Sequence, residues 1–288
     1  MDLHAWWYRD GAWVHPHEAT ISIHDIAVLR GYSAFEALRT YNRRPFHLAD
    51  HLERLYRSAA LIDLEIPCTR EEIADLVQEL IARNPYRHAS VRVLVTGGES
   101  EDGIVATGRP KLIMLISPLG ERDRQRFAQG VFLVTTRLQR EVPEAKTSNY
   151  TAAVRALKAA ARRAADDALF VNAQGHVQEA TRSNFFLFRG DTLVTPAEGV
   201  LPGITRGVVL SLAQGRFPIE ERPILLEELA LADEAFITSS SREIVPVVRI
   251  DEQLIGSGTP GPRTGELQQR FIEMVEGGAW CSSDVANA

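Results

Sequence analysis

The sequence predicts a soluble, globular protein of the α+β or α/β class, built from two domains. Its 288 residues are enough for about two ordinary domains. Apolar residues make up 45% and charged residues 24% of the chain, a balance typical of proteins with a packed core rather than of disordered or fibrous chains. Strand-like runs alternate with amphipathic helical segments along the whole length, which indicates mixed structure.

The first part of the chain, residues 1–118, is expected to form an N-terminal α/β domain. Its strands begin with "WWYRDGAWV", a hairpin that turns at Asp10 and Gly11, and continue with "SVRVLVTGG" and "PKLIMLISPL". The segment "TREEIADLVQELIARN" predicts a helix that opens with a capping box formed by Thr69 and Glu72. The segment "LADHLERLYRSAAL" predicts another helix, whose apolar face comprises Leu48, Leu52, Leu55 and Ala59.

A charged stretch without a sustained apolar period, "ERDRQRFAQG", predicts the interdomain linker at residues 119–128. The C-terminal domain, residues 129–288, then starts with the strand "VFLVTTRLQ". A helix follows from Ser148 or Asn149, since either residue can cap its first turn. The apolar stripe of this helix is expected to comprise Val154, Leu157, Ala161 and Ala164.

The rest of the second domain alternates strands and helices. The segment "ALFVNAQGHVQEATRSNFFLFRGDTLVTP" contains three strand-like runs with turns at residues 172–175 and 190–191. A helix in "GITRGVVLSLAQG", strands in "EAFIT" and "EIVPVVRID", and a final amphipathic helix in "GELQQRFIEMVEG" complete the expected order.

Charge and composition exclude several classes of protein. The net charge of −6, with no basic stripe, argues against nucleic acid as a partner. No apolar run approaches the roughly 20 residues that span a bilayer, and the start lacks a leader pattern, so no membrane contact and a cytoplasmic location are expected. Cys68 and Cys281 lie far apart and outside any CxxC pair, so we expect neither a disulfide nor a metal site.

Lys146 is the first candidate for chemistry. It lies just before the predicted helix, where the backbone dipole disfavours positive charge. Nearby positive potential together with partial burial lowers the pKa of an amine and leaves more of the free base, as a Schiff-base nucleophile requires. The alternative is an ordinary solvated lysine.

Glu179 is the second candidate. In the strand "HVQEATRSN" it points to the same side as Val177, because alternate residues of a strand share a face. A carboxylate on the apolar face would need a partner. The alternative is an exposed strand glutamate with the core on the other face.

Two further segments suit an anion. In "TPAEGVLPGITRGVVL", Pro202 and Gly203 lead into a helix whose first amides, those of Ile204 and Thr205, have no acceptor within the helix. The segment "ITSSSREI" places three serines, 239–241, at the end of a strand. Free amides and hydroxyls can together hold a phosphate, although an ordinary helix start and a serine-rich turn remain open.

Arginines interrupt two apolar runs. Arg30 lies within "IAVLRGYSAFEAL", where Asp25 and Glu36 are possible ion-pair mates. Arg92, within "SVRVLV", has the same two interpretations, structural or functional.

Five stretches together resemble one family. They are "FEALRTYNRRPFHLADHLERLYRSA", "KTSNY", "VQEATRSNFFLF", "LVTPAEGVLPGITR" and "ADEAFITSSSREIVPV". In this order and spacing the chain resembles the class IV, fold-type IV, pyridoxal phosphate transaminases over roughly residues 5 to 275. This family includes branched-chain aminotransferases, D-amino acid transaminases and aminodeoxychorismate lyases. The resemblance implies a small N-terminal and a larger C-terminal α/β domain, a homodimer, pyridoxal 5'-phosphate as cofactor, and amino acid and 2-keto acid substrates.

The resemblance also implies roles for individual residues. Lys146 matches the lysine that forms a Schiff base with the cofactor, and Glu179 matches the carboxylate that pairs with the protonated pyridine nitrogen. Arg54 matches the arginine that holds the cofactor phosphate. The other implied cofactor contacts are Asn149, Tyr150, Gly203, Ile204, Thr205, Ser240 and Ser241.

The implied reaction is a ping-pong transamination, which makes the protein a transferase of nitrogenous groups. The substrate amine displaces Lys146, whose freed amine removes the Cα proton and returns it to C4′ of the cofactor. A keto acid leaves, and the same steps run backwards on a second keto acid.

Substrate choice depends on the groups that bind the carboxylate. Arg30 stands where branched-chain enzymes typically have a tyrosine, and Arg182 follows Glu179 by three residues. Two guanidinium groups favour a carboxylate-bearing substrate, and the pattern resembles a less typical group of D-amino acid transaminases. Gly97 stands where better-known D-amino acid enzymes carry an arginine. The first expectation is therefore a D-amino acid.

Other functions remain open at this point. Arg39 and Arg92 have counterparts in branched-chain aminotransferases, so an L-branched-chain enzyme is the leading alternative, and both arginines join Arg30 and Arg182 as candidates for the substrate carboxylate. An (R)-amine transaminase and an aminodeoxychorismate lyase are further alternatives. A non-catalytic binding protein with the same fold is the alternative outside the enzymes.

Overall fold

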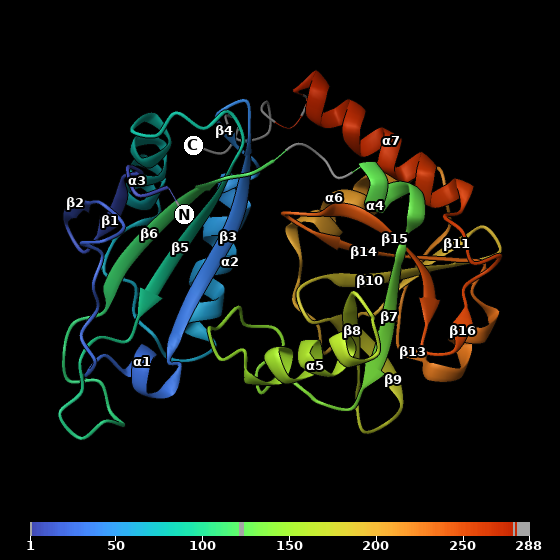
Figure 1. Cartoon of the computed structure of the whole chain (residues 1–288), viewed down its shortest axis with the longest axis horizontal. Coiled ribbons are helices and arrows are strands. Elements are labelled where there is room, and N and C mark those ends of the chain that lie inside the picture. The colour runs from blue at the N-terminus through green and yellow to red at the C-terminus, as the bar shows by residue number, and fades with distance from the viewer. Residues whose placement is uncertain (1, 121–123, 279, 281–288) are drawn as a thin grey trace. The chain divides into compact units, whose positions relative to one another are not determined.

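The chain folds into two compact units (Figure 1). The structure is a computed structural model, and it describes residues 2–120, 124–278 and 280. The first unit holds the described residues up to 120, together with 145–149 and Trp280, and the second holds 124–144 and 150–278.

The first unit is built on a six-stranded sheet. Its order is β2-β1-β6-β5-β3-β4, with antiparallel neighbours throughout. The expected hairpin at Asp10 and Gly11 is confirmed, since both residues have positive φ, 45° and 91°. The strands are β1 (Trp7–Arg9), β2 (Ala12–Val14), β3 (Ser33–Tyr41), β4 (Arg44–Pro45), β5 (Ala89–Thr96) and β6 (Lys111–Pro118).

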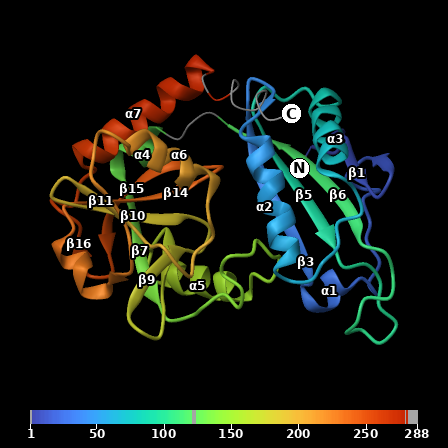
Figure 2. The same cartoon turned by 180° about the vertical axis from the view of Figure 1, so that it is seen from behind.

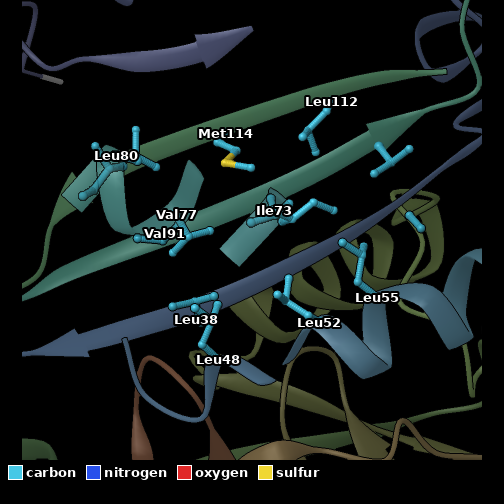
Figure 3. Packing of buried hydrophobic residues seen from close by; sticks show 14 of the residues in the cluster. Leu38, Leu48, Leu52, Leu55, Ile73, Val77, Leu80, Val91, Leu112 and Met114 are labelled. Atoms are coloured by element: carbon cyan, nitrogen blue, oxygen red, sulfur yellow. The ribbon is translucent and has the colours of Figure 1, made fainter. Parts of the chain in front are cut away.

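Two helices, α2 (Leu48–Ala60) and α3 (Arg70–Ala82), cover one face of this sheet, as Figure 2 shows. The expected capping box of Thr69 and Glu72 is present at the start of α3. A short helix, α1 (Ile26–Arg30), precedes β3. Figure 3 shows the core between the helices and the sheet, which includes the predicted leucines of α2 with Leu38, Ile73, Val77, Leu80, Val91, Leu112 and Met114.

Residues 145–149 join the first unit by pairing with the start of β3, where Thr147 and Ala34 form an isolated bridge. Phe35 N donates to Lys146 O at 2.9 Å, and Ser148 N donates to Ser33 O at 3.2 Å. The chain therefore passes between the two units more than once, and not only near residues 119–128, because residues 145–149 return to the first unit. Of the expected linker, residues 121–123 lie outside the described part, and 124–129 form the helix α4 (Arg124–Gln129).

The second unit is built on a ten-stranded mixed sheet. Its order is β12-β11-β10-β14-β15-β7-β8-β9-β13, with β16 paired to β15. The strands are β7 (Val131–Thr136), β8 (Asp167–Val171), β9 (His176–Ala180), β10 (Asn184–Arg189), β11 (Thr192–Thr195), β12 (Ile219–Glu221), β13 (Ile224–Leu225), β14 (Glu234–Ser239), β15 (Glu243–Ile250) and β16 (Gln253–Leu254).

Helices pack against different strands of this second sheet (Figure 1). The helix α5 (Thr151–Arg162) packs on β7 and β8, and α6 (Ile204–Ala213) and α7 (Pro262–Gly277) pack on β14. A 3₁₀ helix, η1 (Leu226–Leu231), precedes β14. Among the described residues, none of the helices combines the length and the apolar character that crossing a membrane requires.

The apolar stripe predicted for α5 is wrong. The buried residues are Ala153, Ala156 and Ala160, whereas Val154 is 48% exposed. Three alanines spaced by three and four positions let the helix backbone approach Ala168 and Phe170 of β8 closely, and the bulkier Val154 is left on the outer side.

Candidate active site

Lys146 lies in the segment that pairs with β3 of the first unit and not next to a helix N-terminus. The helix α5 begins at Thr151 with Tyr150 as its N-cap residue, so neither Ser148 nor Asn149 caps it. The expectation of a lysine next to a helix dipole is therefore wrong. The backbone of Lys146 is fixed by β3 and by Ser58 of α2, whose Oγ accepts from Lys146 N at 3.0 Å.

The amine of Lys146 lies above an aromatic ring. Its Nζ is 4.8 Å from the ring centroid of Phe35, and Cζ of Arg92 is 5.5 Å from the same centroid. In the β3–β5 register Ala37 is opposite Arg92, so Phe35, Ala37 and Arg92 share the sheet face that α2 and α3 leave uncovered. Two cations are thus gathered around one ring.

Arg54 lies on the other face of the sheet, in a buried ionic cluster. Its Nε donates to Glu36 Oε1 at 2.7 Å and its Nη2 donates to Glu36 Oε2 at 2.8 Å. His51 Nδ1 lies 2.7 Å from Glu36 Oε2. Glu36 and His51 are fully buried, and Arg54 is 3% exposed.

Ionised Glu36 is stabilised by this cluster. Burial alone would raise the pKa of its carboxyl, but the charge and hydrogen bonds of Arg54, with a contribution from His51, hold that pKa far below its ordinary value of 4.5. Burial also lowers the pKa of His51, which favours the neutral imidazole. The ion pair between Glu36 and Arg54 is therefore the permanent charge pair of this core.

Glu179 lies on the buried face of β9, as predicted from its parity with Val177. Its expected partner is present, since Arg140 Nη1 donates to Glu179 Oε1 at 2.7 Å. Glu179 Oε2 accepts from Asn184 Nδ2 at 3.3 Å and from Leu201 N at 3.2 Å. A carboxylate that is 5% exposed and accepts from three donors is held in one orientation.

The start of α6 is tied to Glu179 through Asn184. The side chain of Asn184 donates to both Glu179 Oε2 and Leu201 O, the latter at 2.7 Å. Gly203 is the N-cap residue of α6, and a Cβ at this position would overlap with Asn184 Oδ1. The first turn carries no acidic side chain, and its amides, including those of Ile204 and Thr205, have no acceptor within the helix. This geometry suits an anion.

The serines expected to hold a phosphate form the turn between β14 and β15. Ser239 ends β14, and Ser240 and Ser241 follow it. The next residue, Arg242, donates from Nη1 and Nη2 to Asp167 Oδ2, both at 3.2 Å. Because Asp167 is fully buried, it anchors this turn to β8.

The four arginines expected to bind the substrate carboxylate are not gathered in one place. Arg92 and Arg39 lie on the uncovered face of the first sheet, where Arg39 is buried with its Cζ 4.3 Å from the Tyr41 ring centroid. Arg30 is exposed at the end of α1 and donates to Leu29 O at 2.8 Å. In the second unit Arg182 is 53% exposed, with its Nε 3.8 Å from Asp167 Oδ2.

The suggested ion-pair mates of Arg30 are wrong. Glu36 pairs with Arg54, because its position in β3 directs it to the helix-covered face. Asp25 caps α1 by accepting from Ala27 N at 2.9 Å and also accepts from Thr96 Oγ1 at 2.8 Å. Both carboxylates are therefore occupied elsewhere.

Sequence reasoning missed Glu36, His51, Arg140 and Asn184. A signal existed for Glu36, since it alternates with Ala34 and Leu38 in a strand, which is the pattern that singled out Glu179. None was available for Arg140, because it lies in a loop and meets Glu179 only in the fold.

Comparisons with known proteins identify the family of the chain. The family model described as "Amino-transferase class IV" matches residues 33–250. A putative branched-chain-amino-acid aminotransferase of Methanocaldococcus jannaschii is 34% identical over 274 residues, covering 93% of this chain and 95% of the relative. A D-alanine aminotransferase of Listeria monocytogenes is 32% identical over 270 residues, covering 91% and 93%. The crystal structure of a branched-chain amino acid aminotransferase from Thermobaculum terrenum in its PLP form matches with a TM-score of 0.87 and 28% identity, over 96% of this chain and 95% of the other.

Proposed function

Because the chain belongs to the class IV aminotransferase family, we propose that it moves an amino group between a D-amino acid and a 2-keto acid. Enzymes of this family depend on pyridoxal 5'-phosphate, so the chain is an aminotransferase that uses this cofactor and takes amino and keto acids as substrates. The configuration of the amino acid and the roles of single residues are the proposed part.

The donor groups of each unit fit this cofactor. The first unit offers an amine on a fixed backbone, Lys146, and a guanidinium held in one orientation, Arg54, for the aldehyde and the phosphate respectively. The second unit offers the Glu179 carboxylate for the pyridine nitrogen and the start of α6 for the phosphate. Bound pyridoxal phosphate supplies an electron-withdrawing ring that stabilises negative charge at the substrate Cα.

Lys146 would hold the cofactor and move the proton. Its Nζ is the amine that would attach the cofactor aldehyde, and as a free amine it would be the base for the substrate Cα proton. Arg140 and Asn184 hold the Glu179 carboxylate in one orientation, in which it could accept from a protonated ring nitrogen. Ser240 and Ser241 add hydroxyl donors for the phosphate.

The observation that carries the proposed carboxylate site is that Arg92 and Lys146 both contact the ring of Phe35. A carboxylate bound by Arg92 would lie near the same ring as the Lys146 amine. Arg30 adds a further exposed guanidinium at a position where branched-chain enzymes typically carry an uncharged phenol. The preference for a D-amino acid rests on this replacement at Arg30, since Arg92 also has a counterpart in branched-chain aminotransferases.

An L-branched-chain amino acid is the second candidate. The relatives include enzymes named for that substrate, among them the Methanocaldococcus jannaschii protein. Phe35, Ala37 and Leu94 lie on the same sheet face as Arg92, and such a lining would accept an aliphatic side chain.

A homodimer belongs to the same proposal. By analogy with the family, the exposed Arg30 segment would serve the pocket of the neighbouring subunit. Light scattering of the purified chain gives the test, because a mass of one chain in solution would contradict it.

A panel of amino donors tests the substrate. D-alanine, D-glutamate and L-leucine are assayed with pyruvate or 2-oxoglutarate as acceptor, alongside an (R)-amine and aminodeoxychorismate. We expect turnover with the D-amino acids. Turnover with L-leucine alone would overturn the first proposal in favour of the second.

A Lys146→Ala variant tests the proposed role of this lysine. Lys158→Ala, on the exposed side of α5, is the matched control. Borohydride should fix the cofactor on the wild-type chain and on Lys158→Ala but not on Lys146→Ala, as peptide mass spectrometry reads directly. Loss of the proton-transferring base should lower transamination by about 10²-fold to 10⁴-fold.

A further inference from the structure

The buried carboxylate of Glu36 has no part in the chemistry described so far. It lies on the face of β3 that α2 covers, among the apolar side chains Ala34, Leu38 and Leu55. A buried ion pair contributes little net stability compared with apolar residues of the same volume, because both charges lose their hydration. Stability alone is therefore a weak reason for Glu36 to occupy this position.

Glu36 determines how the Arg54 guanidinium is presented. Both carboxylate oxygens engage one edge of the planar group, the edge formed by Nε and Nη2. The plane of the guanidinium and the direction of Nη1 are then fixed, because an arginine fork has a single geometry once two of its donors are bound. An arginine that must meet a phosphate without reorganising benefits from this restriction.

His51 in turn fixes Glu36. Since an ionised carboxylate only accepts, the proton of this pair lies on His51 Nδ1, which donates to Glu36 Oε2 at 2.7 Å. The other ring nitrogen, Nε2, is buried and has no hydrogen-bond partner among the described residues, so a charged imidazolium would lack a second acceptor. His51 therefore acts as a neutral donor that holds the carboxylate against the arginine.

We propose that Glu36, held by His51, is a positioning residue that orients Arg54 for the phosphate of the cofactor. The inference rests on the proposed role of Arg54. The positioning role and simple charge neutralisation predict opposite changes in phosphate affinity when the charge of Glu36 is removed. If Glu36 only neutralised Arg54, removing its charge would strengthen the attraction for a phosphate dianion. If Glu36 positions Arg54, removing it weakens phosphate binding in spite of the added positive charge.

The test compares two ligands that differ only in the phosphate. The full chain is freed of cofactor, and its dissociation constants for pyridoxal 5'-phosphate and for pyridoxal are measured by absorbance. Both ligands react with the same lysine. The dissociation constant for pyridoxal divided by that for pyridoxal 5'-phosphate therefore gives the contribution of the phosphate, and a high ratio means a strong preference for the phosphorylated ligand. We expect Glu36→Gln to reduce the preference for the phosphorylated ligand about tenfold or more, the size of a lost hydrogen bond to a charged group.

Two further variants serve as the negative and the positive control for this measurement. Glu234→Gln alters another buried glutamate, which accepts from Arg263 and Thr264 in the second unit, and should leave the ratio unchanged. Arg54→Lys should lower the ratio at least as far as Glu36→Gln does. A lowered ratio for Arg54→Lys with an unchanged or higher ratio for Glu36→Gln would overturn the positioning role and leave the proposed role of Arg54 intact. An unchanged ratio for Arg54→Lys would overturn both.

A pair of His51 variants carries the test if Glu36→Gln does not fold. The Nδ2 amide of asparagine can replace the donor at Nδ1 of histidine, whereas leucine cannot. We expect His51→Asn to keep most of the phosphate preference and His51→Leu to lose several-fold of it. Equal ratios for the two variants would show that the hydrogen bond to Glu36 has no effect on Arg54.

Discussion

The backbone N–H of Lys146 donates to the hydroxyl of Ser58 at 3.0 Å, which attaches this lysine to the helix that carries Arg54. Ser58 and Arg54 are four residues apart in α2 and lie on the same side of it. The proposed Schiff-base lysine and the proposed phosphate ligand are thus held by one rigid element of the first unit, although they are 92 positions apart in the sequence (146 against 54).

Ser58→Ala should loosen Lys146. The variant removes the acceptor of the Lys146 N–H in a partly buried segment, which should lower the free energy of unfolding by about 1 to 3 kcal/mol. Less precise placement of the amine should also slow transamination. Chemical denaturation and steady-state kinetics measure the two effects. Ser257→Ala, at an exposed serine, is the matched control, and equal behaviour of the two variants would contradict the anchoring role.

Gly203→Ala should disrupt the start of α6. Its methyl group would collide with Asn184, which also donates to Glu179 and Leu201, so both the anion site and the carboxylate should be displaced. Gly207→Ala is a matched control in the same helix, because a Cβ there meets no atom within 4 Å.

We expect Gly203→Ala to weaken cofactor binding measured by absorbance, and to destabilise the chain by about 1 to 3 kcal/mol as overpacking typically does. Gly207→Ala should leave cofactor binding unchanged and should stabilise the helix by up to about 1 kcal/mol. If Gly207→Ala weakened cofactor binding and Gly203→Ala did not, close packing of Gly203 against Asn184 would not be needed for the anion site.

Local patterns in the sequence predict those parts of the site that depend on neighbours within a few residues. The parity of Glu179 with Val177 placed it correctly on a buried face, and Thr69 and Glu72 marked the start of α3. The same parity argument, applied to β3, finds Glu36 among Ala34 and Leu38. The burial of Glu36 is therefore encoded locally, although its partners Arg54 and His51 are not.

Contacts between distant segments could not be predicted in this way. The pairing of residues 145–149 with β3 depends on a free sheet edge that exists only once β5 and β6 are in place. For the same reason the sequence predicted a helix start at Ser148 or Asn149, just after Lys146, since a serine and an asparagine before an alanine-rich segment are typical cap signals. The tertiary pairing overrides that local preference.

Stability in acid should depend on Glu36. Its pKa is held far below the ordinary 4.5 in the folded chain, so the folded state resists a proton that the unfolded state accepts. The contribution is fully present above pH 4.5 and declines as the pH falls below that value.

The measurement is the free energy of unfolding of the cofactor-free chain between pH 5 and pH 3, roughly the titration range of a carboxyl. As the pH falls, this free energy should decrease less steeply for Glu36→Gln than for the wild-type chain, by about 1.4 kcal/mol per pH unit. Glu53→Gln, at an exposed position of α2, should keep the wild-type slope, and a wild-type slope for Glu36→Gln would contradict the shifted pKa.

Arg92→Met should separate substrate binding from folding. Arg92 is exposed on β5, so its replacement should not lower the free energy of unfolding measurably. If it binds the substrate carboxylate, KM for the amino acid should rise by about tenfold to a hundredfold, the size of a lost charge-assisted hydrogen bond. Arg109→Met, at an exposed arginine before β6, is the control and should keep KM unchanged. An amine substrate without a carboxylate tests whether Arg92 acts on the carboxylate itself, because Arg92→Met should not weaken the binding of such an amine. A similar loss for both kinds of substrate would mean that Arg92 shapes the face around Phe35 rather than binding the carboxylate.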